Sequence, residues 1–219
     1  MSDTVSDTEA PLSYTAKPAI SRKPHRACTM KGMPRAPRID AAGAMHHVIA
    51  KGIGGQPVMR DDVDREVLFA RMGKTVLRHR WSCLAYCLLD SHFHVILGTP
   101  VANLGLGMQW LLAPYAREFN KRHERQGNVF HTRFYSRQIQ SDDHLLAALL
   151  YVHLNPVRAG VVSEPERWRW SSYASSIGRC DPPDFLDLEA LLALIAAEPG
   201  IAQRRLQTAA RETLRRELG

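Results

Sequence analysis

The chain has 219 residues, of which 45% are hydrophobic and 23% are charged, a composition typical of a soluble globular protein with one principal domain. No apolar run approaches the roughly 20 residues that span a bilayer, and the N-terminus lacks the apolar stretch of a secretory signal. We therefore expect a cytoplasmic protein with no membrane partner. The net charge of +7 makes a polyanion such as nucleic acid the partner to consider first.

The basic charge is unevenly distributed along the chain. Residues 11–39 carry seven basic and no acidic side chains, residues 1–10 carry three acidic ones, and the other 180 residues contribute only +3. Residues 1–36 are rich in Pro, Ser and Thr and show no sustained hydrophobic periodicity. This composition predicts a disordered basic tail.

Four cysteines occur, and none of them forms a C-x-x-C pair: Cys28, Cys83, Cys87 and Cys180. Cys83 and Cys87 fall within an apolar, strand-like run. We expect free buried thiols in a reducing compartment rather than a zinc site or a disulfide.

Hydrophobic periodicity and turn residues divide the rest of the chain into strands and helices. Strands are predicted at Met45–Lys51, Trp81–Leu88, His92–Leu97 and Val129–Gln138, and helices at Asp61–Arg78, Leu104–His123, from the cap Ser141 to Leu154, and at Phe185–Ala197 and Ile201–Leu218. Pro114 is expected to kink or break its helix, and Pro156 to stop the helix before it. The order β-α-β-β-α-β-α predicts an α+β sandwich with a mainly antiparallel sheet.

Two short motifs bring together residues that suit metal and phosphate chemistry. In a strand, His92 and His94 point to the same side; in a helix, Tyr151 lies one turn from Asn155. Two imidazoles and an amide oxygen can hold one divalent metal, with the tyrosine beside it as a nucleophile. The alternative is a pair of partly exposed imidazoles on a solvated sheet face.

Several other residues compete for a role at such a site. Tyr115 is a second candidate nucleophile, but it continues an apolar helical stripe and is expected to belong to the core. His46 and His47 are neighbours in a strand and so face opposite ways. His153 lies about 200° around its helix from Tyr151 and is not expected to be a ligand.

Basic and aromatic residues alternate in two places, at Arg133-Phe134-Tyr135 with Arg137, and at Arg167-Trp168-Arg169-Trp170. This pattern suits phosphate contacts combined with base stacking, especially on single strands. Arginines that lie over a sheet edge with their charges in water would give the same pattern.

Residues 34–173 resemble the single-tyrosine transposases of the HUH endonuclease superfamily, and among them the REP-associated tyrosine transposases. The motifs that carry the resemblance are Pro37-Arg38-Ile39, His92-Phe93-His94, Phe119-Asn120-Lys121-Arg122-His123, Tyr151 to Gly160, and Trp170-Ser171-Ser172-Tyr173. Departures are Pro114 and the pair Asp90-Ser91, which stands where Pro-Asn is common. The resemblance implies an HUH, ferredoxin-like (RRM-like) domain at residues 37–175, a basic tail at 1–36 and a helical extension at 181–219.

The resemblance also implies an activity and its residues. Tyr151 would be the nucleophile, His92, His94 and Asn155 would bind Mg²⁺ or Mn²⁺, and single-stranded or hairpin DNA would be nicked and rejoined through a 5′-phosphotyrosine. Lys121, Arg122 and Arg158 lie in these motifs and join Arg133 and Arg137 as candidates for DNA contacts. One nucleophile per chain implies a homodimer or a monomer that reacts twice. Two alternatives are a catalytically silent nucleic-acid-binding regulator and a metal-dependent RNase or phosphodiesterase that activates water.

Overall fold

The computed structural model describes residues 41–131 and 133–218. The predicted tail at residues 1–36, Cys28 and the motif Pro37-Arg38-Ile39 therefore lie outside the described residues. No helix within the described ranges has the length and hydropathy needed to cross a membrane.

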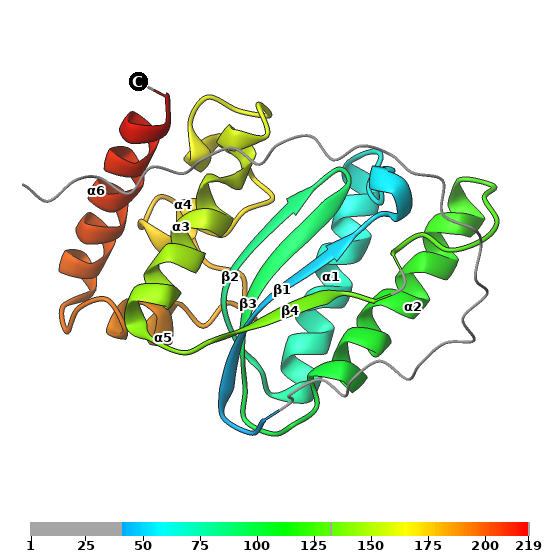
Figure 1. The fold of residues 1–219 in the computed structure, drawn as a ribbon, viewed down its shortest axis with the longest axis horizontal. Coiled ribbons are helices and arrows are strands. Elements are labelled where there is room, and N and C mark those ends of the chain that lie inside the picture. Colours follow the sequence, from blue (N-terminus) through cyan, green and yellow to red (C-terminus); the bar gives the residue numbers. More distant parts are fainter. Residues whose placement is uncertain (1–40, 132, 219) are drawn as a thin grey trace, which may run out of the picture. The chain divides into compact units, whose positions relative to one another are not determined.

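The described chain folds as an α+β sandwich around a four-stranded antiparallel sheet with the order β2-β3-β1-β4 (Figure 1). The strands are β1 (Ala44–Lys51), β2 (Ser82–Leu89), β3 (His92–Thr99) and β4 (Tyr135–Ile139), and the helices between them are α1 (Asp62–His79) and α2 (Leu104–Arg122). This βαββαβ order with β1 and β3 at the centre is the ferredoxin-like arrangement. The predicted fold class is confirmed.

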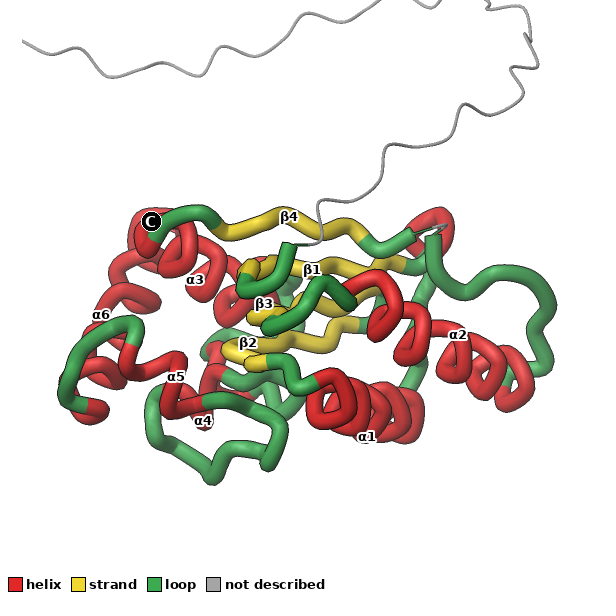
Figure 2. Tube along the Cα trace, turned by 90° about the horizontal axis from the view of Figure 1, so that it is seen from below, coloured by secondary structure: helices red, strands yellow, loops and turns green. Residues whose placement is uncertain are grey.

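The helices after the sheet are α3 (Asp142–Arg158), α4 (Tyr173–Ser176), α5 (Leu188–Ala193) and α6 (Pro199–Leu218), with short 3₁₀ turns at Ile53–Gly55 and Pro165–Arg167. Figure 2 shows α1 and α2 near one end of the strands and α3, α5 and α6 gathered near the other. Ser141 caps α3 as expected, because its hydroxyl accepts a hydrogen bond from the backbone N–H of His144 (3.2 Å).

Two hydrophobic clusters hold the helices on opposite faces of the sheet. The apolar stripe of α2 packs with Val48, Phe93 and Val95 on one face, together with α1. Leu145, Leu149 and Val152 of α3 pack with Cys87 and Ile96 on the other. The thiols of Cys83 and Cys87 are buried and free, as expected.

Three details of the predicted elements are wrong. Helix α2 runs through Pro114 without a break, because buried side chains before and after the proline fix both halves against the sheet. Helix α3 continues through Pro156 and ends at Gly160, whose φ of +67° suits the left-handed conformation that closes many helices. Strand β4 begins at Tyr135, six residues later than predicted.

The C-terminal helices are packed onto α3. Leu154 of α3 and Tyr173 of α4 form a buried cluster with Leu206 and Ala210 of α6. The residues of the predicted extension thus complete the core beside the motif helix, although the predicted boundaries of the domains stay a prediction.

Gly107 marks the closest approach of α2 to β2. A Cβ atom at Gly107 would lie 2.3 Å from the indole ring of Trp81, so Gly107→Ala should lower the free energy of unfolding by about 1–3 kcal/mol. Gly105→Ala is the matched control in the same helix: its Cβ would meet no atom within 4 Å, and it should raise stability by up to about 1 kcal/mol. Urea unfolding measures both, and a stabilised Gly107→Ala would contradict this packing.

His153 is fully buried, and its Nε2 lies 3.1 Å from the hydroxyl of Ser172. Burial lowers the pKa of His153 to about 3, from an ordinary value of 6.5. The unfolded chain therefore binds a proton at this residue before the folded one, and stability is lost as the pH falls from 6.5 towards 3.

We expect His153→Gln to remove this share of the acid sensitivity. Between these pKa values the slope of unfolding free energy against pH should fall by up to one proton, about 1.4 kcal/mol per pH unit. Urea titrations of both proteins at several pH values measure the slope. Equal slopes would show that His153 does not titrate with folding.

Candidate active site

The candidate site lies on the sheet face that α3 covers only in part. Residues paired across an antiparallel sheet share a face, so His92 and His94 lie on the same side as His47 and Ile49 of β1 and Arg137 of β4. The residues of β1 on this side are partly exposed, whereas those on the other side are buried under α1 and α2. The sheet is therefore open to solvent next to the two histidines.

His94 is the buried centre of the site, with 1% of its surface exposed. Its Nδ1 lies 3.0 Å from Nε2 of His47, and its Nε2 lies 3.3 Å from the side-chain amide of Asn155. One arrangement of protons satisfies both contacts: Nδ1–H of His94 donates to His47, and the Asn155 amide donates to Nε2 of His94. In that tautomer Nε2 carries the lone pair that a metal needs.

His92 is held by the hairpin turn that precedes it. Its Nδ1 lies 3.0 Å from the hydroxyl of Ser91, and its ring centroid lies 4.9 Å from that of His94. The backbone carbonyl of Asp90 accepts from the N–H groups of Val58 and Met59, and the Asp90 carboxylate is ion-paired with Arg65. The turn is thus fixed on the protein side, which fixes the position of His92.

Tyr151 lies at the open edge of this histidine cluster, with 44% of its surface exposed. Its ring is edge-on to those of His94 (5.4 Å between centroids) and His47 (5.8 Å). The guanidinium of Arg158 lies 5.3 Å from the ring centroid and is held there by a bidentate ion pair with Glu217 of α6 (2.6 and 2.8 Å). Tyr151 is therefore positioned by neighbours on both sides and open to a ligand.

The imidazoles of the site are neutral near pH 7. Burial, with the neighbouring His92, His47 and Lys51, lowers the pKa of His94 to about 2. Burial, with His144 and Arg137, lowers the pKa of His47 to about 4. Burial and Lys51 also lower the pKa of His92. Neutral imidazoles keep the lone pairs required of metal ligands.

The predicted ligands His92, His94 and Asn155 come together in the structure, and their donor atoms suit a divalent cation: two neutral imidazoles and an amide. Asn155 also hydrogen-bonds to His92. Among the residues described, no group of three or more His, Cys, Asp or Glu side chains is arranged to hold a metal. The predicted set therefore depends on the Asn155 oxygen as its third ligand.

Sequence reasoning missed His47. The alternation of β1 showed that His46 and His47 face opposite ways, but not which of them faces His94. In the structure His46 is buried on the helix-covered side and His47 contacts both His94 and Tyr151. A strand that pairs with β3 and carries a histidine was the available signal.

Tyr115, the second candidate nucleophile, is in the core as predicted. It is 1% exposed, and its hydroxyl donates to the carbonyl of Val58 (2.5 Å). Burial and the nearby Asp64 carboxylate raise the pKa of Tyr115. A phosphate could not reach this hydroxyl without unfolding of α2.

The predicted DNA-binding residues have different surroundings. Arg122 is ion-paired with Asp61 (2.7 Å) and Asp64 (2.5 Å), and Arg158 with Glu217, so both help to hold the fold. Lys121, Arg133 and Arg137 are exposed, and Arg137 lies on the face of the sheet that carries the histidines. Their contacts with DNA remain a prediction.

Comparisons with known proteins give two informative matches. A protein of Haemophilus influenzae described as "Putative REP-associated tyrosine transposase" is 27% identical over 111 residues, which are 46% of this chain and 63% of that protein. A solved structure described as a REP-associated tyrosine transposase bound to a REP hairpin superposes with a TM-score of 0.54 at 17% identity, covering 69% of this chain and 89% of that one.

The remaining comparisons add no argument. A tRNA(His) guanylyltransferase of Saccharomyces cerevisiae gives a TM-score of only 0.39, and no protein-family model matches the chain. The chain spans 63% of the length of the curated relative. The motifs, the sequence match and the shared HUH fold together support the assignment of this chain to the REP-associated tyrosine transposases.

Proposed function

We propose that the protein is a metal-dependent endonuclease and transposase that nicks and rejoins single-stranded or hairpin DNA through Tyr151. The observation that carries the proposal is the exposed Tyr151 ring, edge-on to His94 and one helical turn from Asn155. The similar solved protein is bound to a REP hairpin, which supports hairpin DNA as the substrate.

The reaction would exchange one phosphoester for another. The Tyr151 oxygen attacks the scissile phosphorus and its proton is lost; the bond from phosphorus to the 3′ oxygen breaks, and that oxygen takes up a proton. The products are a 5′-phosphotyrosine and a free 3′-hydroxyl, which can later attack the phosphotyrosine and rejoin a strand. No outside energy source is needed, because the number of phosphoester bonds is conserved.

His92, His94 and Asn155 would hold Mg²⁺ or Mn²⁺, which would withdraw charge from the non-bridging oxygens of the phosphate. The other roles belong to the chain itself. His47 orients His94, Arg158 positions the Tyr151 ring, and the open side of the sheet admits the DNA. Two strand transfers would require a homodimer or two successive reactions on one chain.

Two alternatives give different outcomes in one assay. A catalytically silent DNA-binding regulator would bind hairpin DNA without cutting it, and a phosphodiesterase that activates water would cut without becoming attached. The exposure and orientation of Tyr151 favour the covalent route. Covalent capture of labelled DNA therefore separates the three.

Tyr151→Phe should abolish the covalent adduct while preserving folding and DNA binding, because it removes one exposed hydroxyl and little volume. Tyr115→Phe is the matched control and should keep the adduct, at a cost of about 1 kcal/mol in stability from the lost hydrogen bond. The measurement is incubation with labelled hairpin DNA and Mg²⁺ or Mn²⁺, then denaturing electrophoresis and peptide mapping. An adduct on Tyr115, or one that persists in Tyr151→Phe, would overturn the assignment.

Substitution of the histidines should separate ligands from their support. His92→Ala and His94→Ala should abolish Mn²⁺ binding and cleavage, and EDTA should have the same effect on the wild type. His47→Ala should weaken Mn²⁺ binding by about 10- to 100-fold, as expected for a residue that orients a ligand. Calorimetric titration with Mn²⁺ measures binding without catalysis. Full cleavage in EDTA would refute the metal requirement.

A further inference from the structure

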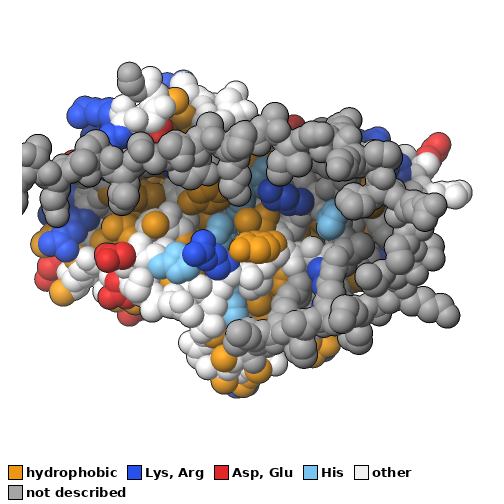
Figure 3. Space-filling model, in the orientation of Figure 1, with side chains coloured by type: hydrophobic (Ala, Val, Ile, Leu, Met, Phe, Trp, Pro, Cys, Tyr) orange, Lys and Arg blue, Asp and Glu red, His pale blue; other side chains and the backbone are white. Residues whose placement is uncertain are grey.

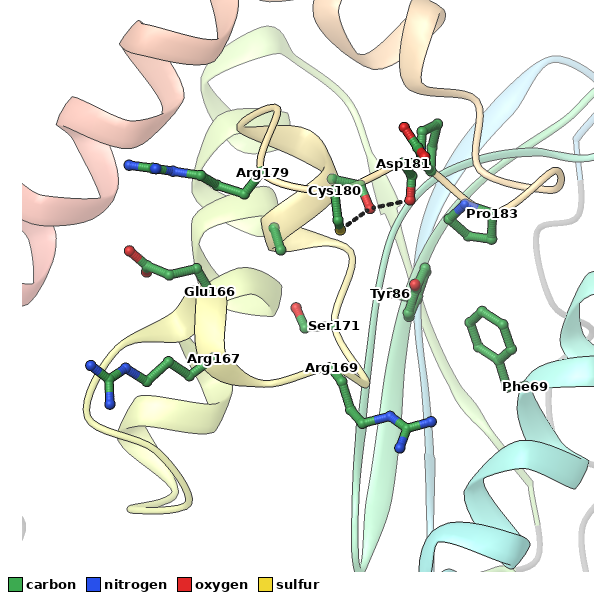
Figure 4. A pocket seen from close by; sticks show the side chains of 13 residues that line it. Phe69, Tyr86, Glu166, Arg167, Arg169, Ser171, Arg179, Cys180, Asp181 and Pro183 are labelled. Carbon is green, nitrogen blue, oxygen red and sulfur yellow. Dashed lines mark hydrogen bonds between the residues drawn. The ribbon is translucent and has the colours of Figure 1, made fainter.

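A cavity of about 480 Å³ lies away from the candidate active site, between α1, β2 and residues 166–183 (Figure 4). Its volume falls within the range of small-molecule sites, roughly 300–1,000 Å³. Its wall is anchored to β2, because Leu88 N–H donates to Trp170 O (2.9 Å) and the indole of Trp168 donates to Leu88 O (2.9 Å). The cavity therefore has a fixed frame on the sheet side.

The side of the cavity next to the sheet is aromatic and carries one unused polar group. Phe69 and Tyr86 line it, with their rings edge-on at 5.4 Å. Tyr86 is only 3% exposed, yet its hydroxyl has no hydrogen-bond partner among the described residues. Buried hydroxyls are normally paired, so this group is available to a ligand.

The rim of the cavity is basic. Arg167 is paired with Glu164 (2.6 Å), but Arg169 lies 3.7 Å from two exposed carboxylates, and the guanidinium of Arg179 makes no ion pair in the described chain. Glu166 and Asp181 also line the cavity. Figure 4 shows Arg167, Arg169 and Arg179 extending from three separate points of the rim. Arg169 and Arg179 are therefore the cations most available to an anion.

We propose that this cavity binds one nucleotide of a DNA single strand, with its base against Phe69 and Tyr86 and its phosphate on Arg169 and Arg179. An aromatic wall beside free arginines is the combination that single-stranded nucleic acids require. A duplex keeps its bases stacked and would offer the cavity only phosphates. The inference rests on the proposed function, because it takes DNA as the ligand.

The bound nucleotide would lie outside the scissile position. Cys87 is paired with His94 and shares its face of the sheet, so Tyr86, the next residue along β2, points to the opposite face. The backbone of Ser171 bridges to Cys87 at the edge of the sheet, about two strand spacings, or roughly 10 Å, from the backbone of His94. The cavity would therefore hold DNA flanking the cleaved phosphate.

Cys180 provides a direct test, because it lines the cavity and is exposed, whereas Cys83 and Cys87 are buried and burial raises the pKa of both thiols. The full chain is alkylated with N-ethylmaleimide, and modification of the Cys180 peptide is followed by mass spectrometry. A hairpin with single-stranded flanks should slow this modification at least about threefold, as expected if a bound group excludes the reagent from most molecules. A blunt hairpin or dTMP alone should not.

Binding measurements assign the contacts. In fluorescence anisotropy, Arg169→Ala/Arg179→Ala should reduce the slope of log K against log salt by about 0.7 per phosphate lost. Tyr86→Phe should weaken binding by about 2- to 10-fold through one lost hydrogen bond. Lys74→Ala/Arg117→Ala removes two exposed charges from α1 and α2 and is the control that should weaken binding less.

The outcomes separate this inference from the proposed function. Covalent attachment at Tyr151 without protection of Cys180, or equal salt slopes in the two double variants, would overturn the cavity site alone. Protection by dTMP as strong as by the flanked hairpin would show a free-nucleotide site and refute the single-strand assignment. Absence of any DNA binding would refute both proposals.

Discussion

The candidate site depends on the burial of one imidazole. His94 is almost completely buried, and an unpaired nitrogen there would cost about 1–3 kcal/mol. Its two partners come from different elements: His47 from β1 and Asn155 from α3. The register of β1 against β3 and the position of α3 are therefore both tied to the same ring. A shift of β1 by one residue would turn His47 to the helix-covered face and remove one partner.

The charges around this imidazole also favour its role. The charged side chains that act on His47, His92 and His94 are basic, namely Lys51 and Arg137. Beside neutral imidazoles they attract a phosphodiester (Figure 3 shows histidine and basic side chains together on this surface). The Arg158 charge is offset by Glu217, so its main effect here is to hold the Tyr151 ring. The site can thus gather phosphate while keeping its metal-binding atoms unprotonated.

Local pattern was enough to predict the fold class and the grouping of the motif residues. Alternation along β3 placed His92 and His94 together, and the helical period placed Tyr151 above Asn155, because both follow from backbone geometry alone. Tyr115 was predicted to be in the core for the same reason: it continues the stripe of Leu111. These predictions required no knowledge of how distant segments meet.

The features that were mispredicted depend on tertiary contacts. Pro114 and Pro156 each disfavour helix by about 3 kcal/mol locally, yet the packing of their helices outweighs that cost. The start of β4 is set by its pairing with β1, which the composition of residues 129–134 does not reveal. The role of His47 needed the order of the strands, since only the neighbour relation of β1 and β3 brings it to His94.

The C-terminal helices show how far the site extends beyond its motifs. Leu206 and Ala210 anchor α6 against Leu154 of α3, and this contact brings Glu217 to Arg158. Tyr151 and Arg158 are seven residues apart on α3, two turns along one face, so α6 acts on the proposed nucleophile through a single intermediate side chain. Residues 181–219 are therefore better understood as part of the support of the site than as a separate appendage, because the geometry at Tyr151 depends on the position of α6.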